Sequence, residues 1–96
     1  MYVRLVRFDL AEGKQEVAKR LADDLVPAII GQPGCKSVMC VGDDESAEYG
    51  LIVVWESEKA ANDAAKIMAP QLERHLSGNV RRPPERHLFA VIAASP

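Results

Sequence analysis

Tyr49-Gly-Leu-Ile-Val-Val-Trp55 is the stretch that decides the fold of this chain. It is short and rich in β-branched and aromatic residues, which predicts a β-strand. Side chains along a strand point alternately to its two faces. Both sets are apolar in this stretch, whereas an antiparallel strand with one solvated face alternates polar with apolar residues. We therefore expect a strand that is covered on both sides.

The segments around this strand predict an α+β domain. Strands are expected at residues 2–8, 35–42, 48–56 and 87–94, and helical stripes of apolar residues at 14–30 and after Ser57 up to Gly78. The order βαββαβ is the ferredoxin-like arrangement, a four-stranded antiparallel sheet with two helices on one face. We expect one such domain over residues 1–96.

Prolines and caps mark the expected ends of the helices. Pro27 lies inside the first stripe and is expected to kink or end that helix within one turn. Ser57 is a good N-cap for the second helix. Pro70 predicts a break of the second helix near Ala69, and Gly78 predicts its end.

The uncovered face of the predicted sheet indicates self-association. Residues 88–94 are apolar on both alternating faces, as is the strand at 48–56. Two helices cover only one face of a four-stranded sheet, so the other face needs a partner. A second copy of the chain is the simplest one, which predicts a homodimer. The alternative is that this face is an ordinary mixture of exposed apolar groups.

Composition excludes several classes of protein. The 96 residues are 48% hydrophobic and 27% charged, unlike a disordered chain, and the net charge of -2 offers no electrostatic basis for nucleic-acid binding. No apolar run reaches the roughly 18 to 20 residues of a membrane span. We expect no signal peptide and no disulfide framework, and therefore a cytoplasmic location.

Several short motifs recur in a fixed order after the opening strand. They are Leu25-Val26-Pro27, Gln32-Pro33-Gly34-Cys35, Val54-Trp55-Glu56-Ser57 and the segment from Pro70 to His75. Their order and spacing over residues 2–94 resemble the antibiotic biosynthesis monooxygenase domains of the dimeric α+β barrel superfamily. The resemblance implies protomers that join through their sheets and hold a cavity between sheet and helices. It also implies a reaction of O₂ with polyaromatic substrates that uses no cofactor, neither metal nor flavin.

The residues depart from the haem-degrading branch of that superfamily. The branch uses an Asn on the first strand, a Trp in the second helix and a His ten residues after this Trp. His75 matches the histidine, but Ala65 stands at the Trp position and Val6 at the Asn position. Trp55 lies at a strand end and is no substitute. Haem degradation is therefore not expected.

His75 is the candidate catalytic residue. It lies on the apolar stripe of the second helix, where a neutral imidazole can act as a base near physiological pH. A base is needed to form the electron-rich substrate carbanion that reacts with O₂. The alternative is a structural histidine at the rim of the core.

Arg4, Tyr49, Trp55 and Met68 are the candidate substrate-binding residues. If its face of the first strand lines the cavity, Arg4 is a buried cation that needs a partner or an anionic ligand. Arg7 takes this role if the register is reversed. Tyr49 has a hydroxyl that could hold a phenolic or carbonyl oxygen. Each of these residues also has an alternative role, and for Trp55 this is a core side chain whose N–H is satisfied nearby.

The remaining polar groups give weaker signals. Cys35 and Cys40 are five residues apart, so we expect them on opposite faces of a strand and unable to bridge. Arg81, Arg82, Arg86 and His87 form a basic cluster, interpreted as a solvated loop or a partner for the acidic loop at 43–45. The alternative is a cavity mouth that gathers an anionic substrate. Neither histidine has metal-spaced neighbours, so no metal site is expected.

Two functions of different classes remain from the sequence. The first is a cofactor-free monooxygenase that acts on a small aromatic or polyketide-like molecule in the cavity between sheet and helices. The second is a non-catalytic, ligand-binding or stress-associated dimer with the same fold. A set of polar groups that converges in the cavity would distinguish the enzyme from the binding protein.

Overall fold

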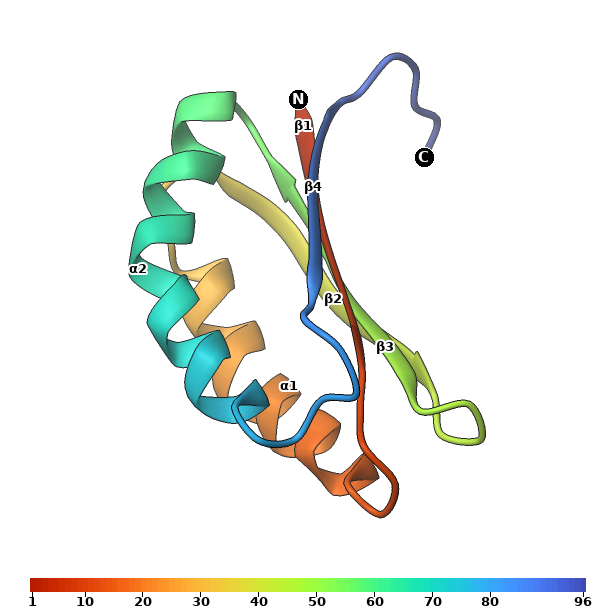
Figure 1. Cartoon of the computed structure of the whole chain (residues 1–96). Coiled ribbons are helices and arrows are strands. Elements are labelled where there is room, and N and C mark those ends of the chain that lie inside the picture. Colours follow the sequence, from red (N-terminus) through yellow and green to blue (C-terminus); the bar gives the residue numbers. More distant parts are fainter.

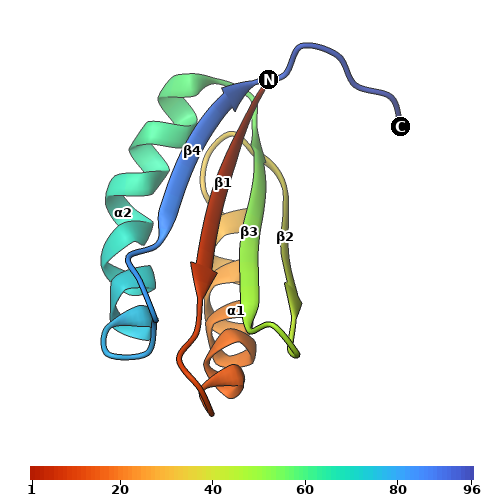
Figure 2. The same cartoon turned by 45° about the vertical axis from the view of Figure 1, so that its right-hand side comes forward.

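Four antiparallel strands form one sheet in the computed structural model, which describes all 96 residues. They are β1 (Tyr2–Asp9), β2 (Cys35–Asp43), β3 (Glu48–Trp55) and β4 (Glu85–Ala90), in the sheet order β2-β3-β1-β4. The strand that decides the fold, β3, therefore lies inside the sheet between β2 and β1 (Figure 2). The ferredoxin-like α+β fold predicted from the sequence is confirmed.

Both helices lie on the same face of this sheet (Figure 1). They are α1 (Gln15–Ile30) and α2 (Glu58–Leu76). Ser57 caps α2 as predicted, since its hydroxyl accepts a hydrogen bond of 3.0 Å from the backbone N–H of Ala60. Neither helix is long and apolar enough to cross a membrane. We call the two sides of the sheet the helix-covered face and the open face.

The strand register determines which side chains reach the helix-covered face. Val6 and Phe8 of β1 are buried there in the core. Because side chains alternate along a strand, Arg4 shares their face and Arg7 points to the open face. The sequence left open whether Arg4 or Arg7 lines the cavity, and Arg4 is the one that faces the helices.

The core fills the space between α1 and the sheet more completely than the space under α2. The stripe of α1 is buried as predicted, and it consists of Val17, Leu21, Leu25 and Ile29. Toward the N-terminal half of α2 the buried residues are Ala61 and Ala64. Alanine fills much less volume than leucine, so an alanine stripe leaves room between helix and sheet.

The prolines change the helices less than the sequence suggests. Pro27 lies in the last turn of α1, which ends three residues later at Ile30, within the turn that was predicted. The predicted break near Ala69 is wrong, because α2 continues through Pro70 to Leu76. Proline removes one backbone donor, and burial of the apolar stripe on both sides of Pro70 holds the helix together.

The last strand ends four residues earlier than predicted. Ala90 pairs with Tyr2, the first residue of β1, and β1 is the sole neighbour of β4 in the sheet. Only one further hydrogen bond follows, from the N–H of Val91 to the carbonyl of Met1 at 2.9 Å. The chain then leaves the sheet toward the C-terminus, as Figure 1 shows. The ladder stops because no partner strand is left.

A bulge in β2 corrects the expectation for the two cysteines. Cys35 pairs with Trp55 and Cys40 with Leu51, and the register shifts between Cys35 and Ser37. The extra residue of a bulge reverses the alternation of side chains, so both cysteines lie on the helix-covered face. Both are free thiols. Burial raises the pKa of each above its ordinary value.

Candidate functional site

An apolar cavity opens between α2 and the helix-covered face of the sheet. Twelve of its fourteen lining residues are hydrophobic, and the other two are Arg4 and Arg86. About 70 Å³ of the cavity is open to the centre of a water molecule, and the unfilled space including the mouth is about 540 Å³. One water needs about 10–15 Å³ of the smaller of these two volumes, so the enclosed part of the cavity has room for several waters or one small ring.

The alanines of α2 create this cavity. Ala61, Ala64, Ala65 and Ala69 form its roof, and Met68 and Leu72 lie among them. The floor comes from β1 and β3, with Leu51 and Val53 among its residues. Met68, predicted from the sequence as a substrate-binding residue, therefore lines the cavity.

Arg4 presents an incompletely paired guanidinium to the cavity. Its Nη2 donates a hydrogen bond of 2.9 Å to Oδ1 of Asn62 on α2. Its Nε is buried and has no hydrogen-bond partner. Burial lowers the pKa of Arg4 below its ordinary value, and the positive charge of Arg86 lowers it further. A guanidinium stays protonated at neutral pH, so Arg4 is a cation with a neutral partner and a positive neighbour.

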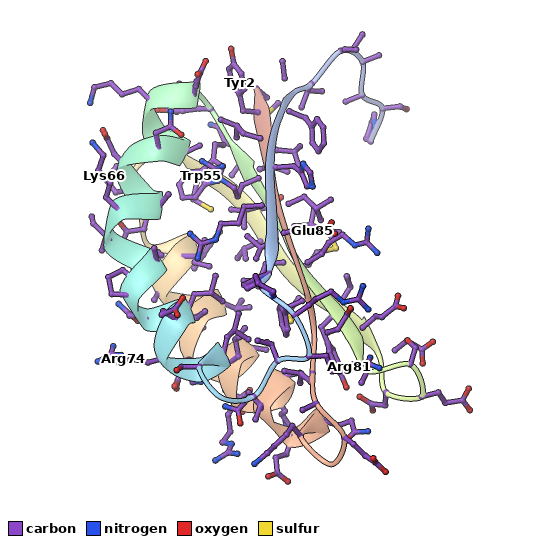
Figure 3. All side chains as sticks on the ribbon, in the orientation of Figure 1. Tyr2, Trp55, Lys66, Arg74, Arg81 and Glu85 are labelled. Carbon is purple, nitrogen blue, oxygen red and sulfur yellow. The ribbon has the colours of Figure 1, made fainter.

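Trp55 contributes a second unpaired donor to the same cavity. The side chain is buried at the end of β3 and lies between the sheet and α2, whereas Lys66 and Arg74 extend from the outer side of that helix (Figure 3). Its indole Nε1 is buried and has no hydrogen-bond partner. Trp55 is therefore a core side chain, as expected, but its N–H lacks the hydrogen-bond partner that was expected.

Arg86 is the residue of the cavity that sequence reasoning placed elsewhere. It belongs to β4 and pairs with Val6, so it shares the helix-covered face with Arg4. Pro83-Pro84 suggested a loop that extends through residue 86. The signal that could have found it is its spacing, because Arg86 stands two residues before Leu88 and the two therefore share a strand face.

The rest of the basic cluster is dispersed. Arg81 donates from Nη2 to the backbone carbonyl of Ser46 at 2.7 Å, and so reaches the loop between β2 and β3. Arg82 pairs with the carboxylate of Asp9 at 2.6 Å. His87 lies on the open face, next in sequence to Arg86. Only one member of the cluster therefore reaches the cavity.

Tyr49 lies outside the cavity, away from the other residues predicted to bind substrate. Its hydroxyl donates a hydrogen bond of 2.6 Å to Asp44, and its ring stacks on Phe8 with centroids 5.8 Å apart. Gly42 passes so close to the ring that a Cβ at this position would lie 2.1 Å from it. Burial, then the hydrogen bond and charge of Asp44, raise the pKa of Tyr49 to about 12. Tyr49 acts as a core residue.

His75 does not line the cavity either, so the structure does not bring it together with Arg4, Trp55 and Met68. Its Nε2 lies 3.0 Å from Oδ2 of Asp24 on α1. Gln71 and Arg74 border the same shallow hollow on the outer surface. This last part of α2 packs against α1 and not over the cavity, and His75 therefore contacts Asp24 of α1. No group of three or more His, Cys, Asp or Glu side chains is arranged so that it could hold a metal ion.

Comparison with known families places this chain in a group of related proteins. The model of the antibiotic biosynthesis monooxygenase family matches residues 1–66. The chain belongs to this family. The matched part includes Arg4, Trp55 and the alanines at the start of α2, and it ends before His75 and Arg86. No curated protein matches the chain.

Several solved structures share the fold at low sequence identity. Rv0793 from Mycobacterium tuberculosis has a TM-score of 0.85 and 14% identity, covering 99% of this chain and 98% of that one. PA3566 from Pseudomonas aeruginosa has a TM-score of 0.79 and 16% identity, covering 96% and 94%. A structure described as an antibiotic biosynthesis monooxygenase has a TM-score of 0.76 and 13% identity, covering 97% and 100%. These similarities establish the fold alone.

Proposed function

We propose that this family member oxygenates a small aromatic or polyketide-like molecule in the cavity under α2, with O₂ and without a cofactor. One observation carries the proposal: an apolar cavity contains Arg4, Arg86 and the indole N–H of Trp55, none of which has an anionic partner. An apolar pocket with a few convergent polar groups is the usual form of a small-molecule site. Family membership supplies the reaction type.

The proposed reaction balances with the substrate as the only reductant. An activated ring CH₂ next to a carbonyl loses a proton and becomes an enolate, which adds O₂ at carbon. Loss of water from the resulting hydroperoxide leaves a C=O group where the CH₂ was. One oxygen atom enters the product and the other leaves as water. Donors such as Arg4 and Trp55 would stabilise the enolate oxygen in a site that excludes water.

A specific observation favours the alternative, a non-catalytic ligand-binding or stress-associated dimer. The lining of the cavity contains no His, Asp, Glu, Lys, Tyr or Cys side chain. No residue of this chain is therefore placed to remove a proton from a substrate. Binding alone requires only the apolar walls and the donors.

The homodimer predicted from the sequence remains part of the proposal. The open face carries large apolar side chains, among them Met39, which is 53% exposed, and Phe89, which is 52% exposed. Ile52 and Val54 of the central strand lie on this face. Burying such a row against a second copy is the simplest way to remove it from water. We expect this dimer in the cytoplasm, where free thiols stay reduced.

Oxygen uptake tests the proposed activity. The purified protein is mixed with a panel of anthrones, naphthols and simple phenols, and O₂ consumption and quinone formation are followed together. We expect one O₂ consumed per quinone formed, and a loss of about 10²-fold or more in rate for Arg4→Met. Arg7→Met is the matched control, because Arg7 lies on the same strand but faces the other way. Ligand binding without O₂ uptake would favour the non-catalytic alternative.

A further inference from the structure

The buried donors of this chain show an unusual imbalance. Only two buried side-chain nitrogen or oxygen atoms lack a hydrogen-bond partner, Nε of Arg4 and Nε1 of Trp55. Both are donors, and both residues line the same cavity. Native proteins satisfy nearly all buried polar groups, so each exception calls for an explanation. A ligand that offers an acceptor oxygen explains both at once.

The sheet register brings these donors within reach of one another. Arg4 pairs with Val53 across β1 and β3, and Trp55 is two residues further along β3 on the same face. On the other side Arg4 pairs with Leu88, and Arg86 is two residues before it on β4. Diagonal neighbours of this kind lie about 7–8 Å apart and long side chains bridge that distance. Arg4 therefore stands between an indole N–H and a second guanidinium.

No negative charge of the protein balances the two arginines. No Asp or Glu lines the cavity. Every other arginine on the strands or the loop before β4 has an oxygen partner: Arg7 lies 4.0 Å from Glu85, Arg81 bonds to a backbone carbonyl, and Arg82 pairs with Asp9. Arg4 bonds only to the neutral amide of Asn62, and Arg86 forms no salt bridge. Two neighbouring like charges, a partly buried Arg4 and an exposed Arg86, favour an anion between them.

We propose, building on the function proposed above, that the cavity takes its ligand as an anion: a small planar apolar molecule with one ionised oxygen group directed to Arg4, Arg86 and Trp55. The apolar walls formed by Leu51, Met68 and the α2 alanines hold the ring. The ligand class is therefore aromatic carboxylates and ionised phenols or enols, and uncharged aromatic molecules bind more weakly.

This choice of ligand removes the need for a base in the protein. A phenol or enol that binds as its anion releases its proton to solvent water. The positive charges stabilise the anion over the neutral form, so the pKa of the bound ligand falls. The absence of a proton acceptor from the cavity lining then agrees with oxygenation as well as with simple binding.

Paired calorimetric titrations test the charge preference. Benzoate and benzamide have nearly the same shape and differ in charge. We expect the protein to bind benzoate about tenfold or more tightly than benzamide. Arg4→Met and Arg86→Met should each remove most of this preference while benzamide binding and the melting temperature persist. Arg7→Met should retain it, because Arg7 faces the other side of the sheet.

Three results would overturn the inference. They are equal affinity for the two ligands, no binding of either at millimolar concentration, and an equal loss of preference in Arg7→Met. A second probe, 4-nitrophenol, reports ionisation directly because its anion absorbs visible light. We expect the bound probe to ionise at a lower pH than the free probe, and an unchanged titration would contradict the proposal.

The oxygen-uptake assay separates this inference from the proposed function. Preference for benzoate without O₂ consumption retains the anion site and removes the enzyme. O₂ consumption by a protein that binds benzoate and benzamide equally retains the enzyme and removes the anion site.

Discussion

The two faces of the sheet are built from similar apolar residues but differ in how they treat charge. On the open face, Arg7 and His87 both lie near the carboxylate of Glu85, at 4.0 Å and 3.8 Å. On the helix-covered face, Arg4 and Arg86 have no carboxylate within salt-bridge distance. The charges of the open face are thus paired, whereas the partly buried Arg4 and the exposed Arg86 on the other face have no carboxylate partner.

The faces also differ in how their apolar residues are covered. Leu51 and Val53 are buried under the helices, whereas Met39 and Phe89 on the open face are half-exposed. The helix-covered face therefore lacks a counter-ion for its arginines, and the open face lacks a partner that buries its apolar side chains. The comparison suggests that a small anion completes the first and a second chain completes the second.

Val54→Lys should produce the largest effect, because it places a charge in the open face. The residue pairs with Val3 across the two inner strands of the sheet. We expect loss of the dimer with aggregation or unfolding, since a lone protomer exposes its apolar sheet. Sedimentation equilibrium gives the mass. Ile67→Lys, on the outer surface of α2, is the control and should leave the mass unchanged. A wild-type protein that sediments as a stable 10.5 kDa monomer would contradict the proposal.

Leu72→Ala should cause the next largest effect, on the helix-covered face. Leu72 is buried at the edge of the cavity, so truncation should cost about 2–5 kcal/mol in the free energy of unfolding. Met68→Ala should cost less, because Met68 is only partly buried and already borders empty space. Urea denaturation measures both. Equal losses would show that Met68 is packed as tightly as the core.

Asp44→Ala should change the titration of Tyr49 without affecting the cavity. In a Tyr2→Phe background Tyr49 is the one remaining tyrosine, and its phenolate absorbance gives the pKa. We expect the pKa to fall from about 12 but to stay above 10.0, since burial is the largest cause of the raised value.

A raised pKa of Tyr49 favours the neutral phenol in the folded state. This contribution to stability is present below pH 10 and is lost as the pH rises toward 12. An unchanged pKa would refute the role of Asp44.

His75→Ala should have the smallest effect. The imidazole lies against the exposed Asp24 on the outer surface, where an ion pair contributes about 1 kcal/mol or less. We expect a small drop in melting temperature and unchanged ligand affinity. A large loss of affinity or of oxygen uptake would restore His75 as a residue of the site.

Much of the fold could be predicted because it depends on local periodicity. The run of β-branched and aromatic residues in β3 identifies a strand, and the stripe of α1 identifies a helix and its buried side. The end of β4 could not be predicted, because it depends on where β1 begins. The bulge near Ser37 was equally hidden, since one extra residue in β2 leaves no signal in composition.

The candidate site was only partly predictable for the same reason. Arg4, Trp55 and Met68 were candidates from the sequence and do line the cavity. Periodicity alone left open whether Arg4 or Arg7 faces it. Tyr49 shares a face with Arg4 but lies at the far end of β3, beyond the cavity, and periodicity does not give position along an element. His75 has the same difficulty on α2, where α1 and not the cavity is its neighbour.

The indole N–H of Trp55 offers the most direct test of the account. Trp55 is the only tryptophan in the chain, so its N–H gives one indole resonance in a ¹⁵N-labelled sample. We predict that benzoate shifts this resonance saturably, with the affinity found by calorimetry, and that Arg4→Met abolishes the shift while Arg7→Met retains it. A resonance that stays in place while benzoate binds would show that the anion lies elsewhere, and would contradict the assignment of the cavity as its site.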